Sequence, residues 1–169
     1  MFLILVASLM AGLVFFSFSH RWKTLAKGVK ADRVRVEKSA RRLTLLSKGN
    51  TLKVYRISLG TVPEGTKEKE GDGRTPEGVY TLDSRNPHSA YHLALHVSYP
   101  DAKDRQRAVK SGLSCGGDIM IHGMPDGWAW LGSLHRFWDW TAGCMAVTNV
   151  EMEEIWRAVP VGTPIEILP

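Results

Sequence analysis

The sequence predicts a mainly β domain of the α+β class, with two or three short helices. Hydrophobic and polar residues alternate with period two in several short segments, which is typical of half-buried strands. Turn residues separate these segments, and only two stretches carry helix start and stop signals. The chain has 169 residues, of which 44% are hydrophobic and 23% charged. This composition is sufficient for one domain with one core.

The first half of the folded part contains three predicted strands, at residues 33–37, 42–45 and 51–59. The turn sequence Lys-Gly-Asn at 48–50 separates the second strand from the third. The residues expected to point inward are Val34, Val36, Leu43, Leu45, Leu52, Val54 and Ile57.

A long loop is predicted at residues 60–78, because this stretch is dense in glycine, proline and charge. Further strands are expected at 78–82, 92–97, 118–123 and 162–168. The strand at 118–123 is apolar and ends at a histidine.

Two helices are predicted. The first covers residues 101–112, with Asp101 near its start and Gly112 as its stop signal. The second begins at Thr148, because Thr148 and Glu151 have the spacing of a capping box, and it runs for about ten residues.

The N-terminal residues 1–18 carry no charge. Their number is at the lower bound for a membrane span and also fits the apolar part of a signal peptide. An uncleaved anchor is favoured, because no convincing cleavage site follows, and a buried helix is the third alternative. The sequence thus predicts an anchor or signal segment at 1–18, a basic tether at 19–31 and a folded domain at 32–169.

The charge is unevenly distributed along the chain. The segment from Arg21 to Arg56 carries 12 of the 22 basic residues and a net charge of +10, and the remainder carries −5. This asymmetry argues against a nucleic-acid-binding core and favours a membrane-proximal basic surface. Basic residues directly after an apolar segment would place the domain in the cytoplasm by the positive-inside rule.

His122 and Cys144 are the candidate catalytic residues. His122 ends an apolar strand, where a histidine is held rigidly and can act as a general base near neutral pH. Cys144 follows Gly143, which permits a tight turn, so the amides of Gly143, Cys144 and Met145 could converge into an oxyanion hole. The alternatives are a packed histidine and a small buried thiol.

Residues 124–141 contain four of the six tryptophans, Trp128, Trp130, Trp138 and Trp140. They either line a groove or complete the core.

At these residues the sequence resembles the L,D-transpeptidase (YkuD-type) catalytic domain. The family's strand-end His-Gly corresponds to 122–123, and its Ser/Thr-x-Gly-Cys corresponds to 141–144. A family-like Gly-Asp-x-x-Thr-Pro-x-Gly-x-Tyr stretch precedes them, with Gly71, Asp72, Thr75, Pro76, Gly78 and Tyr80. The resemblance spans roughly residues 33–168.

The resemblance implies a β-sandwich or barrel domain that acts on peptidoglycan stem peptides in cell-wall cross-linking or remodelling. Cys144 would form a thioacyl-enzyme, His122 would act as base and later as acid, and Gly123 would orient its ring. No metal or organic cofactor is implied, and the domain would face the periplasm or cell wall. The expected substrate groove contains Trp128, Trp138, Trp140, Thr141 and Arg136.

The sequence departs from many family members at Ala146, where they carry an arginine. A branch similar to enzymes that cut cross-links or release bound lipoprotein also lacks it. The departure leaves transferase and hydrolase activity open, with Arg136 as the nearest basic candidate for the vacant role.

Other candidate residues are weaker. On a strand His92 and His96 are about 13 Å apart, too far to share one metal ion. His135 is expected to pack, with a secondary catalytic role as the alternative. Cys115 is expected to be a turn residue, with a bridge to Cys144 as the alternative. The rival functions are a papain-like peptidase, which the His-before-Cys order disfavours, and a non-catalytic wall-binding module.

Overall fold

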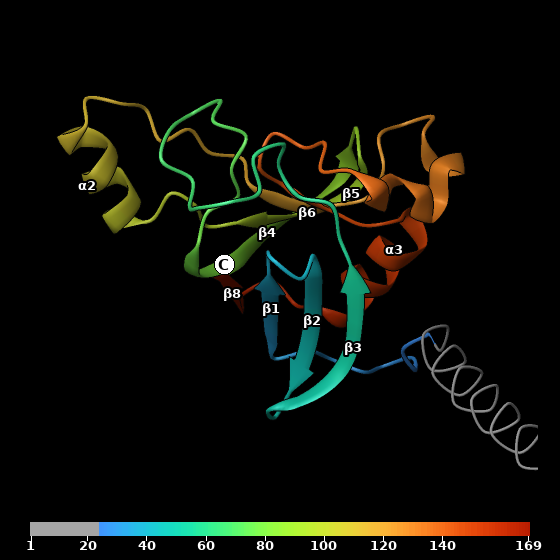
Figure 1. Cartoon of the computed structure of the whole chain (residues 1–169). Coiled ribbons are helices and arrows are strands. Elements are labelled where there is room, and N and C mark those ends of the chain that lie inside the picture. The colour runs from blue at the N-terminus through green and yellow to red at the C-terminus, as the bar shows by residue number, and fades with distance from the viewer. Residues whose placement is uncertain (1–23) are drawn as a thin grey trace, which may run out of the picture.

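In the computed structural model, which describes residues 24–169, eight strands form one curled sheet (Figure 1). The strands are β1 (Arg33–Glu37), β2 (Arg42–Ser47), β3 (Asn50–Arg56), β4 (Gly78–Ser89), β5 (His92–Val97), β6 (Met120–His122), β7 (Met145–Ala146) and β8 (Thr163–Leu168). Their order across the sheet is β3-β2-β1-β8-β4-β5-β6-β7. Two neighbouring pairs, β1 with β8 and β6 with β7, are parallel. The mainly β class predicted from the sequence is confirmed.

The two edges of the sheet meet, because the chain that leaves β3 pairs with β7 at the opposite edge. Ser58 and Ala146 exchange backbone hydrogen bonds of 3.0 and 2.9 Å, and Gly60 bridges to Thr141. Asp139 strengthens this junction, because its carboxylate accepts from the Leu59 amide at 2.8 Å. The closed sheet therefore carries β7 between β6 and the segment that follows β3.

The hydrophobic core lies inside the curl of the sheet. Strand β8 is central to it, because it pairs with β1 on one side and β4 on the other. Its inward residues Ile165 and Ile167 are at most 1% exposed, as are Val34 and Val36 on β1. Burial of these aliphatic side chains is the main stabilising contribution to the fold.

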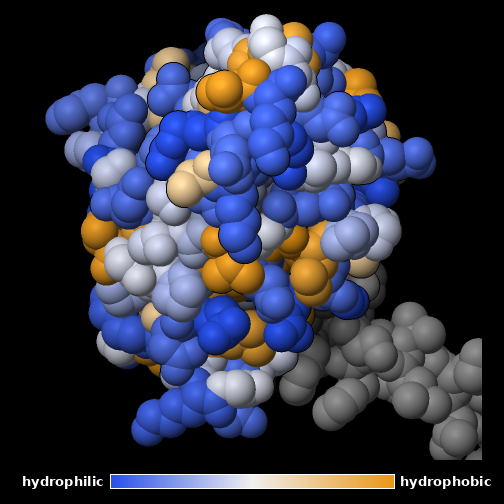
Figure 2. Space-filling view, turned by 90° about the vertical axis from the view of Figure 1, so that its left-hand side faces the viewer, coloured by the Kyte–Doolittle hydropathy of each residue, from blue (hydrophilic) through white to orange (hydrophobic). Residues whose placement is uncertain are grey.

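Three helical segments flank the sheet: α2 (Ala102–Lys110), η1 (Ala129–Phe137) and α3 (Asn149–Ala158). Thr148 caps α3 through the predicted capping box, and Asp101, predicted near the start of α2, caps that helix through a second capping box with Asp104. The 3-10 segment η1 was not predicted, and it contains part of the tryptophan-rich stretch. Figure 1 shows α2 and α3 on opposite sides of the sheet. The side that carries α2 is mostly hydrophilic (Figure 2).

Two local predictions are corrected by the structure. Val54 was expected to point inward, but it is 46% exposed, and Tyr55 is buried instead. The register of β2 with β3 shifts at a bulge between Leu45 and Leu46, so the inward-facing Leu43 pairs with Tyr55. The Tyr55 hydroxyl then donates to Glu154 of α3 at 2.9 Å. Strand β4 is longer than the predicted 78–82, because its pairing with β5 continues to Ser89.

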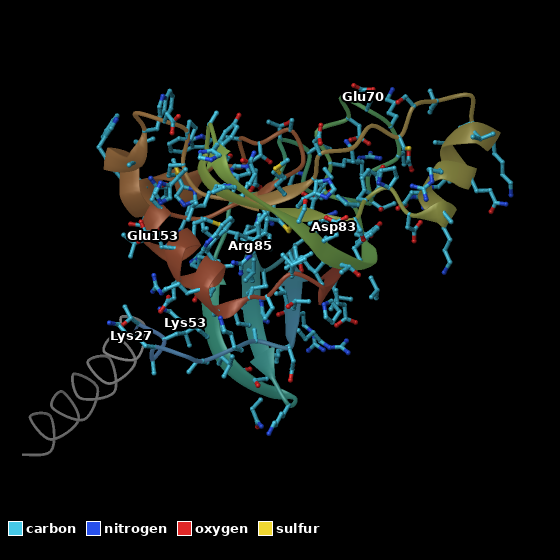
Figure 3. All side chains as sticks on the ribbon, turned by 180° about the vertical axis from the view of Figure 1, so that it is seen from behind. Lys27, Lys53, Glu70, Asp83, Arg85 and Glu153 are labelled. Atoms are coloured by element: carbon cyan, nitrogen blue, oxygen red, sulfur yellow. The ribbon has the colours of Figure 1, made fainter. Side chains whose placement is uncertain are left out.

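Residues 24–31, the described part of the segment predicted as a tether, lie against the domain. The Ala31 amide donates to the carbonyl of Ala158 at 2.8 Å, and the Lys30 ammonium donates to the carbonyl of Arg157 at 2.7 Å. Figure 3 shows Lys27 at this end of the domain, near Lys53. The segment 1–18 lies outside the described residues, and within 24–169 no helix is long and apolar enough to cross a membrane.

Glu154 joins this N-terminal segment to the sheet and to α3. Its carboxylate is 4% exposed and accepts from the Leu25 amide, the Lys53 ammonium and the Tyr55 hydroxyl. Burial alone would raise the pKa of Glu154, but these three hydrogen bonds hold it below its ordinary value. The ionised carboxylate is therefore part of the folded structure.

We expect Glu154→Gln to lower the free energy of unfolding by about 1–3 kcal/mol, because charged hydrogen bonds are lost in a buried place. Since the folded pKa is depressed, the wild-type advantage is complete above the unfolded pKa of about 4.3. This advantage in the free energy of unfolding decreases as the pH falls through the pKa of Glu154 in the folded protein. Denaturant unfolding at several pH values measures this difference. Glu153→Gln is the matched control, because the Glu153 side chain is 50% exposed and faces His92. Equal stability of the two variants at neutral pH would contradict this role for Glu154.

Candidate active site

His122 ends β6 with its side chain 4% exposed. Its Nδ1 lies 2.7 Å from the carbonyl oxygen of Gly123. A carbonyl can only accept, so Nδ1 carries the proton in the neutral ring and Nε2 is left as the basic nitrogen. The carbonyl of Gly123 therefore lies where it can orient the imidazole, which is the role expected of Gly123.

Two aromatic side chains lie next to the imidazole of His122. The ring centroid of Tyr91 is 4.5 Å away and that of Trp140 is 5.9 Å away. Burial lowers the pKa of His122, and the hydrogen bond to Gly123 opposes this only in part. The ring is therefore neutral, and able to accept a proton, at neutral pH.

Cys144 lies directly before β7, the strand next to β6. Strands β6 and β7 are parallel, and His122 pairs with Ala146. Side chains two residues apart point to the same face of a strand, so Cys144 lies on the face that carries His122. It is displaced by two residues, about 7 Å along the strand, and by one strand spacing of about 4.8 Å. A cysteine and a histidine side chain that turn toward each other can span this separation.

The thiol of Cys144 lies beside the backbone of 118–120. Its Sγ donates to the carbonyl of Asp118 at 3.5 Å. Burial is the largest effect on the pKa of the Cys144 thiol, and it raises this pKa. The charge of Asp118 also raises it, while the Met120 amide and the charge of Lys67 lower it. The resting pair is therefore a neutral thiol and a neutral imidazole.

The turn before Cys144 is fixed by Thr141. The Thr141 hydroxyl donates to the carbonyl of Cys144 at 2.8 Å and accepts from the Gly143 amide at 3.1 Å. Gly143 has φ +128°, and a Cβ there would lie 2.5 Å from the carbonyl oxygen of Arg74. This position accepts only glycine, because both the backbone angle and the space exclude a side chain.

These contacts change two expectations from the sequence. Thr141 is 5% exposed, so it positions the turn and does not line an open groove. The Gly143 amide already donates to Thr141, so Gly143 is not an oxyanion donor in this conformation. The amides of Cys144 and Met145 stay predicted donors.

The tryptophan-rich segment is divided between the surface and the site. Trp128 and Trp138 are 55% and 49% exposed at the two ends of η1, where their role in a groove stays a prediction. Trp140 is half-buried and contacts His122. His135 is fully buried, and its Nδ1 lies 2.9 Å from the Ser58 hydroxyl, so it packs at the junction of the sheet edges.

Arg136 is held by Glu151 of α3 in an ion pair. Its guanidinium is therefore engaged in the fold, and the suggestion that it takes over the role of the arginine missing at 146 is not supported by this geometry.

The two histidines considered for metal binding have separate partners. His92 contacts Glu153 at 3.1 Å, and His96 contacts Asp83 at 2.7 Å. Throughout the described part of the chain, no three side chains of His, Cys, Asp or Glu are grouped so that they could hold a metal ion.

Sequence reasoning missed several residues that shape the site: Ser58, Lys67, Tyr91, Asp118 and Asp139. Ser58 and Asp139 act through the closure of the sheet, which joins segments about 80 residues apart and leaves no local signal. Asp139 lies two residues before the motif at 141–144, and this closeness was the one available indication in the sequence.

A family model described as the L,D-transpeptidase catalytic domain, YkuD, matches residues 31–167. Among curated proteins, the chain is 30% identical over 108 residues to "Putative L,D-transpeptidase YafK" of Escherichia coli (strain K12). The match covers 62% of this chain and 36% of the relative, so the chain corresponds to about a third of that protein.

Solved structures show the same fold. The helical cell shape determining protein Pgp2 from Campylobacter jejuni matches with a TM-score of 0.61 and 25% identity, over 87% of this chain and 50% of that one. Bd1075 from Bdellovibrio bacteriovorus matches with a TM-score of 0.57 and 24% identity, over 86% and 50%. An L,D-transpeptidase from Xylanimonas cellulosilytica matches with a TM-score of 0.53 and 16% identity, over 86% and 64%. The chain spans half of the length of the first two.

We expect the free protein to react with iodoacetamide at Cys144 with a pH midpoint above the ordinary thiol value of about 8.5. The raised pKa means that thiolate forms only as the pH rises past that value. Peptide mass mapping of the modified full-length protein separates Cys144 from Cys115. A midpoint below 7 would instead indicate a resting thiolate–imidazolium pair and contradict the neutral one.

Proposed function

The chain belongs to the YkuD family of L,D-transpeptidase catalytic domains, and we propose that it is a cysteine acyltransferase of the cell envelope that acts on peptidoglycan stem peptides. The observation that carries the proposal is the parallel pairing of β6 and β7, because Cys144 directly precedes β7 and His122 ends β6. Nucleophilic catalysis by a thiol and a general base needs the two side chains within hydrogen-bond reach, and their backbone positions allow this when the side chains turn toward each other.

The first half of the reaction forms the thioacyl-enzyme. The Cys144 thiol turns from the Asp118 carbonyl to Nε2 of His122, which takes its proton as sulfur attacks the carbonyl carbon of an L,D peptide bond. The tetrahedral intermediate collapses, the C–N bond breaks, and His122 gives the proton to the amine of the leaving D-residue. A thioester between Cys144 and the stem peptide remains.

The second half releases the acyl group. An amine of a second stem peptide, or water, attacks the thioester carbonyl while Nε2 of His122 accepts its proton. The C–S bond then breaks, and the proton returns to sulfur. Attack by an amine gives a cross-link, and attack by water gives a shortened peptide.

Burial of both groups favours this sequence of proton transfers. A neutral imidazole is ready to accept a proton, and a neutral thiol is ready to give one, without a charged pair that must be desolvated in the resting enzyme. Negative charge appears on the sulfur and the oxyanion only during the reaction. Hydrogen-bond donors directed at these atoms therefore stabilise the transition state more than the resting enzyme.

The proposed location is the cell envelope, with the domain facing the periplasm or cell wall. The substrate of the proposed reaction lies there, and residues 1–18 would serve as an anchor or signal segment. Pgp2 is described as a helical cell shape determining protein. By analogy, the present chain would act in wall remodelling that affects cell shape.

Cys144→Ala is expected to abolish turnover of purified muropeptides, because the proposed thioester forms on the sulfur of Cys144. His122→Ala should lower the rate by about 10²–10⁴-fold, which is the usual contribution of a positioned acid and base. Product masses after incubation with the full-length protein measure both effects, and thermal unfolding shows that the variants are folded. Wild-type activity in folded Cys144→Ala would exclude this nucleophile. Inactivity of the wild-type protein on every muropeptide would favour the alternative of a non-catalytic wall-binding module.

A hydrolase of the same fold is the second candidate, and Ala146 favours it. Ala146 is fully buried between Ser58 and His122, and its methyl group offers no hydrogen-bond donor to a substrate carboxylate. Arg136 is held by Glu151, so it does not replace the missing cation. Weaker retention of an incoming peptide would leave the thioester open to water.

With donor and acceptor muropeptides both supplied, we expect at least as much hydrolysed as cross-linked product. The ratio of the two product masses over time decides between the reactions. Almost exclusive cross-linking would show that the acceptor is bound well without an arginine at 146, and would reject the hydrolase alternative.

A further inference from the structure

A cavity of about 470 Å³ lies between the N-terminal segment and α3. Residues 25–30 form one side of it, residues 156–158 of α3 form another, and Arg85 of β4 lies beside them. The segment is fixed at both ends, because the Leu25 amide donates to the Glu154 carboxylate and the Ala31 amide donates to the Ala158 carbonyl at 2.8 Å. Small-ligand sites have volumes of roughly 300–1,000 Å³, so the cavity has the size of a binding site. None of its lining residues belongs to the candidate active site.

Four basic side chains line this cavity, and none of them is paired with an acid. They are Lys27, Lys30, Arg85 and Arg157. No carboxylate of residues 24–169 lies within ion-pair distance of any of the four. Residues 1–23 contain no aspartate or glutamate, so that part of the sequence supplies no acidic partner either. A concave site lined by unpaired cations attracts anions.

Glu154 is the one acidic residue of the lining, and its charge is already compensated. Its buried carboxylate accepts from the Lys53 ammonium, the Tyr55 hydroxyl and the Leu25 amide. Lys53 and Glu154 therefore form a neutral pair. The four other charged side chains give the cavity an excess of positive charge.

Two of the four cations are held in place by the C-terminal end of α3. The Lys30 ammonium donates to the Arg157 carbonyl at 2.7 Å. Nη2 of Arg85 donates to the carbonyls of Trp156 and Val159 at 2.8 and 2.5 Å, and its guanidinium lies 4.7 Å from the centre of the Trp156 ring. These contacts satisfy the last carbonyls of the helix, which is a structural role. Each side chain has further N–H donors, so both can also bind a ligand without moving.

The position of the cavity indicates the source of the anion. Residue 24 follows the apolar segment 1–18 by six positions, and a chain extends at most about 3.6 Å per residue, so the two are within about 22 Å of each other. Figure 3 shows Lys27 at the end of the domain where the described chain begins. With residues 1–18 in a membrane, as proposed above, the anions nearest to the cavity are the phosphates of phospholipid headgroups. Clusters of Lys and Arg next to a membrane-spanning segment bind anionic lipids.

We propose that this cavity binds the phosphodiester headgroup of an anionic phospholipid through Lys27, Lys30, Arg85 and Arg157. A bound headgroup and the apolar segment give the domain two attachments to the same membrane, which fixes its orientation better than one. The proposal uses the anchoring role of residues 1–18 and goes beyond the proposed reaction, because it does not involve His122 or Cys144.

The test uses the full-length protein in a nonionic detergent. Phosphatidylglycerol and phosphatidylcholine with the same acyl chains are titrated separately, and native mass spectrometry measures the fraction of protein that carries one lipid. The decisive variant is Lys27→Gln/Arg157→Gln, because these two exposed side chains make no hydrogen bond or ion pair within residues 24–169. The matched control is Lys103→Gln/Lys110→Gln, which removes two exposed charges from α2, on the other side of the sheet (Figure 1).

The wild type should bind phosphatidylglycerol more tightly than phosphatidylcholine. Lys27→Gln/Arg157→Gln should weaken binding of phosphatidylglycerol by about 10–30-fold, since each basic residue near an anionic lipid contributes roughly fivefold in affinity. The control variant should bind like the wild type. Equal affinity of the wild type for the two lipids, or unchanged binding by the folded decisive variant, would overturn the proposal and leave Lys30 and Arg85 as caps of α3 alone.

A soluble phosphate ester could use the same cations, so glycerol 3-phosphate is titrated in parallel. Binding of glycerol 3-phosphate as tight as that of phosphatidylglycerol would overturn the assignment to a lipid. Thermal unfolding shows whether each variant is folded. Where the double variant is not, Lys27→Gln and Arg157→Gln are measured singly, with an expected loss of about three- to fivefold each, and unchanged binding in both would equally overturn the proposal.

Discussion

The backbone pairing of Ser58 with Ala146 is the constraint on which the rest of the site depends. Strand β7 has only two residues, too few to define its own position, and Cys144 lies directly before it. The β7 backbone is held on one side by β6 and on the other by Ser58. Each such hydrogen bond contributes about 0.5–1.5 kcal/mol. Its importance here is geometric, because closure of the sheet holds β7, and Cys144 directly before it, against β6, which ends at His122.

The site combines strict backbone geometry with an electrostatically neutral resting state. Gly143 and Thr141 fix the turn, while burial keeps both His122 and Cys144 uncharged. A buried ion pair at rest would require the desolvation of two charges. A neutral pair requires no such desolvation at rest, and charges form only when the thiol reacts. The predicted oxyanion donors, the amides of Cys144 and Met145, belong to this fixed turn, so little reorganisation would be needed to stabilise the developing charge.

Much of the fold and the two catalytic candidates could be predicted, because the signals are local. Alternation identified β1 and β2, Asp101 and Gly112 marked the two ends of α2, a capping box identified α3, and the two motifs identified His122 and Cys144 as candidates. Non-local contacts could not be predicted in this way. Tyr55 replaces Val54 inside because the register of β2 with β3 shifts at a bulge, and Arg136 is engaged because Glu151 lies opposite it. Lys67 belongs to a charged loop sequence that looks solvated, and only the folded loop shows that it is buried.

The most direct test of the account is the mass of the full-length protein after brief incubation with a stem tetrapeptide donor and rapid acid quenching. The account predicts an increase equal to the acyl part of the donor, located by peptide mapping on Cys144 and absent from Cys144→Ala. Incubation of His122→Ala should give the same adduct more slowly. An adduct on any other residue, or turnover with no covalent adduct under conditions in which the thioester is stable, would contradict it.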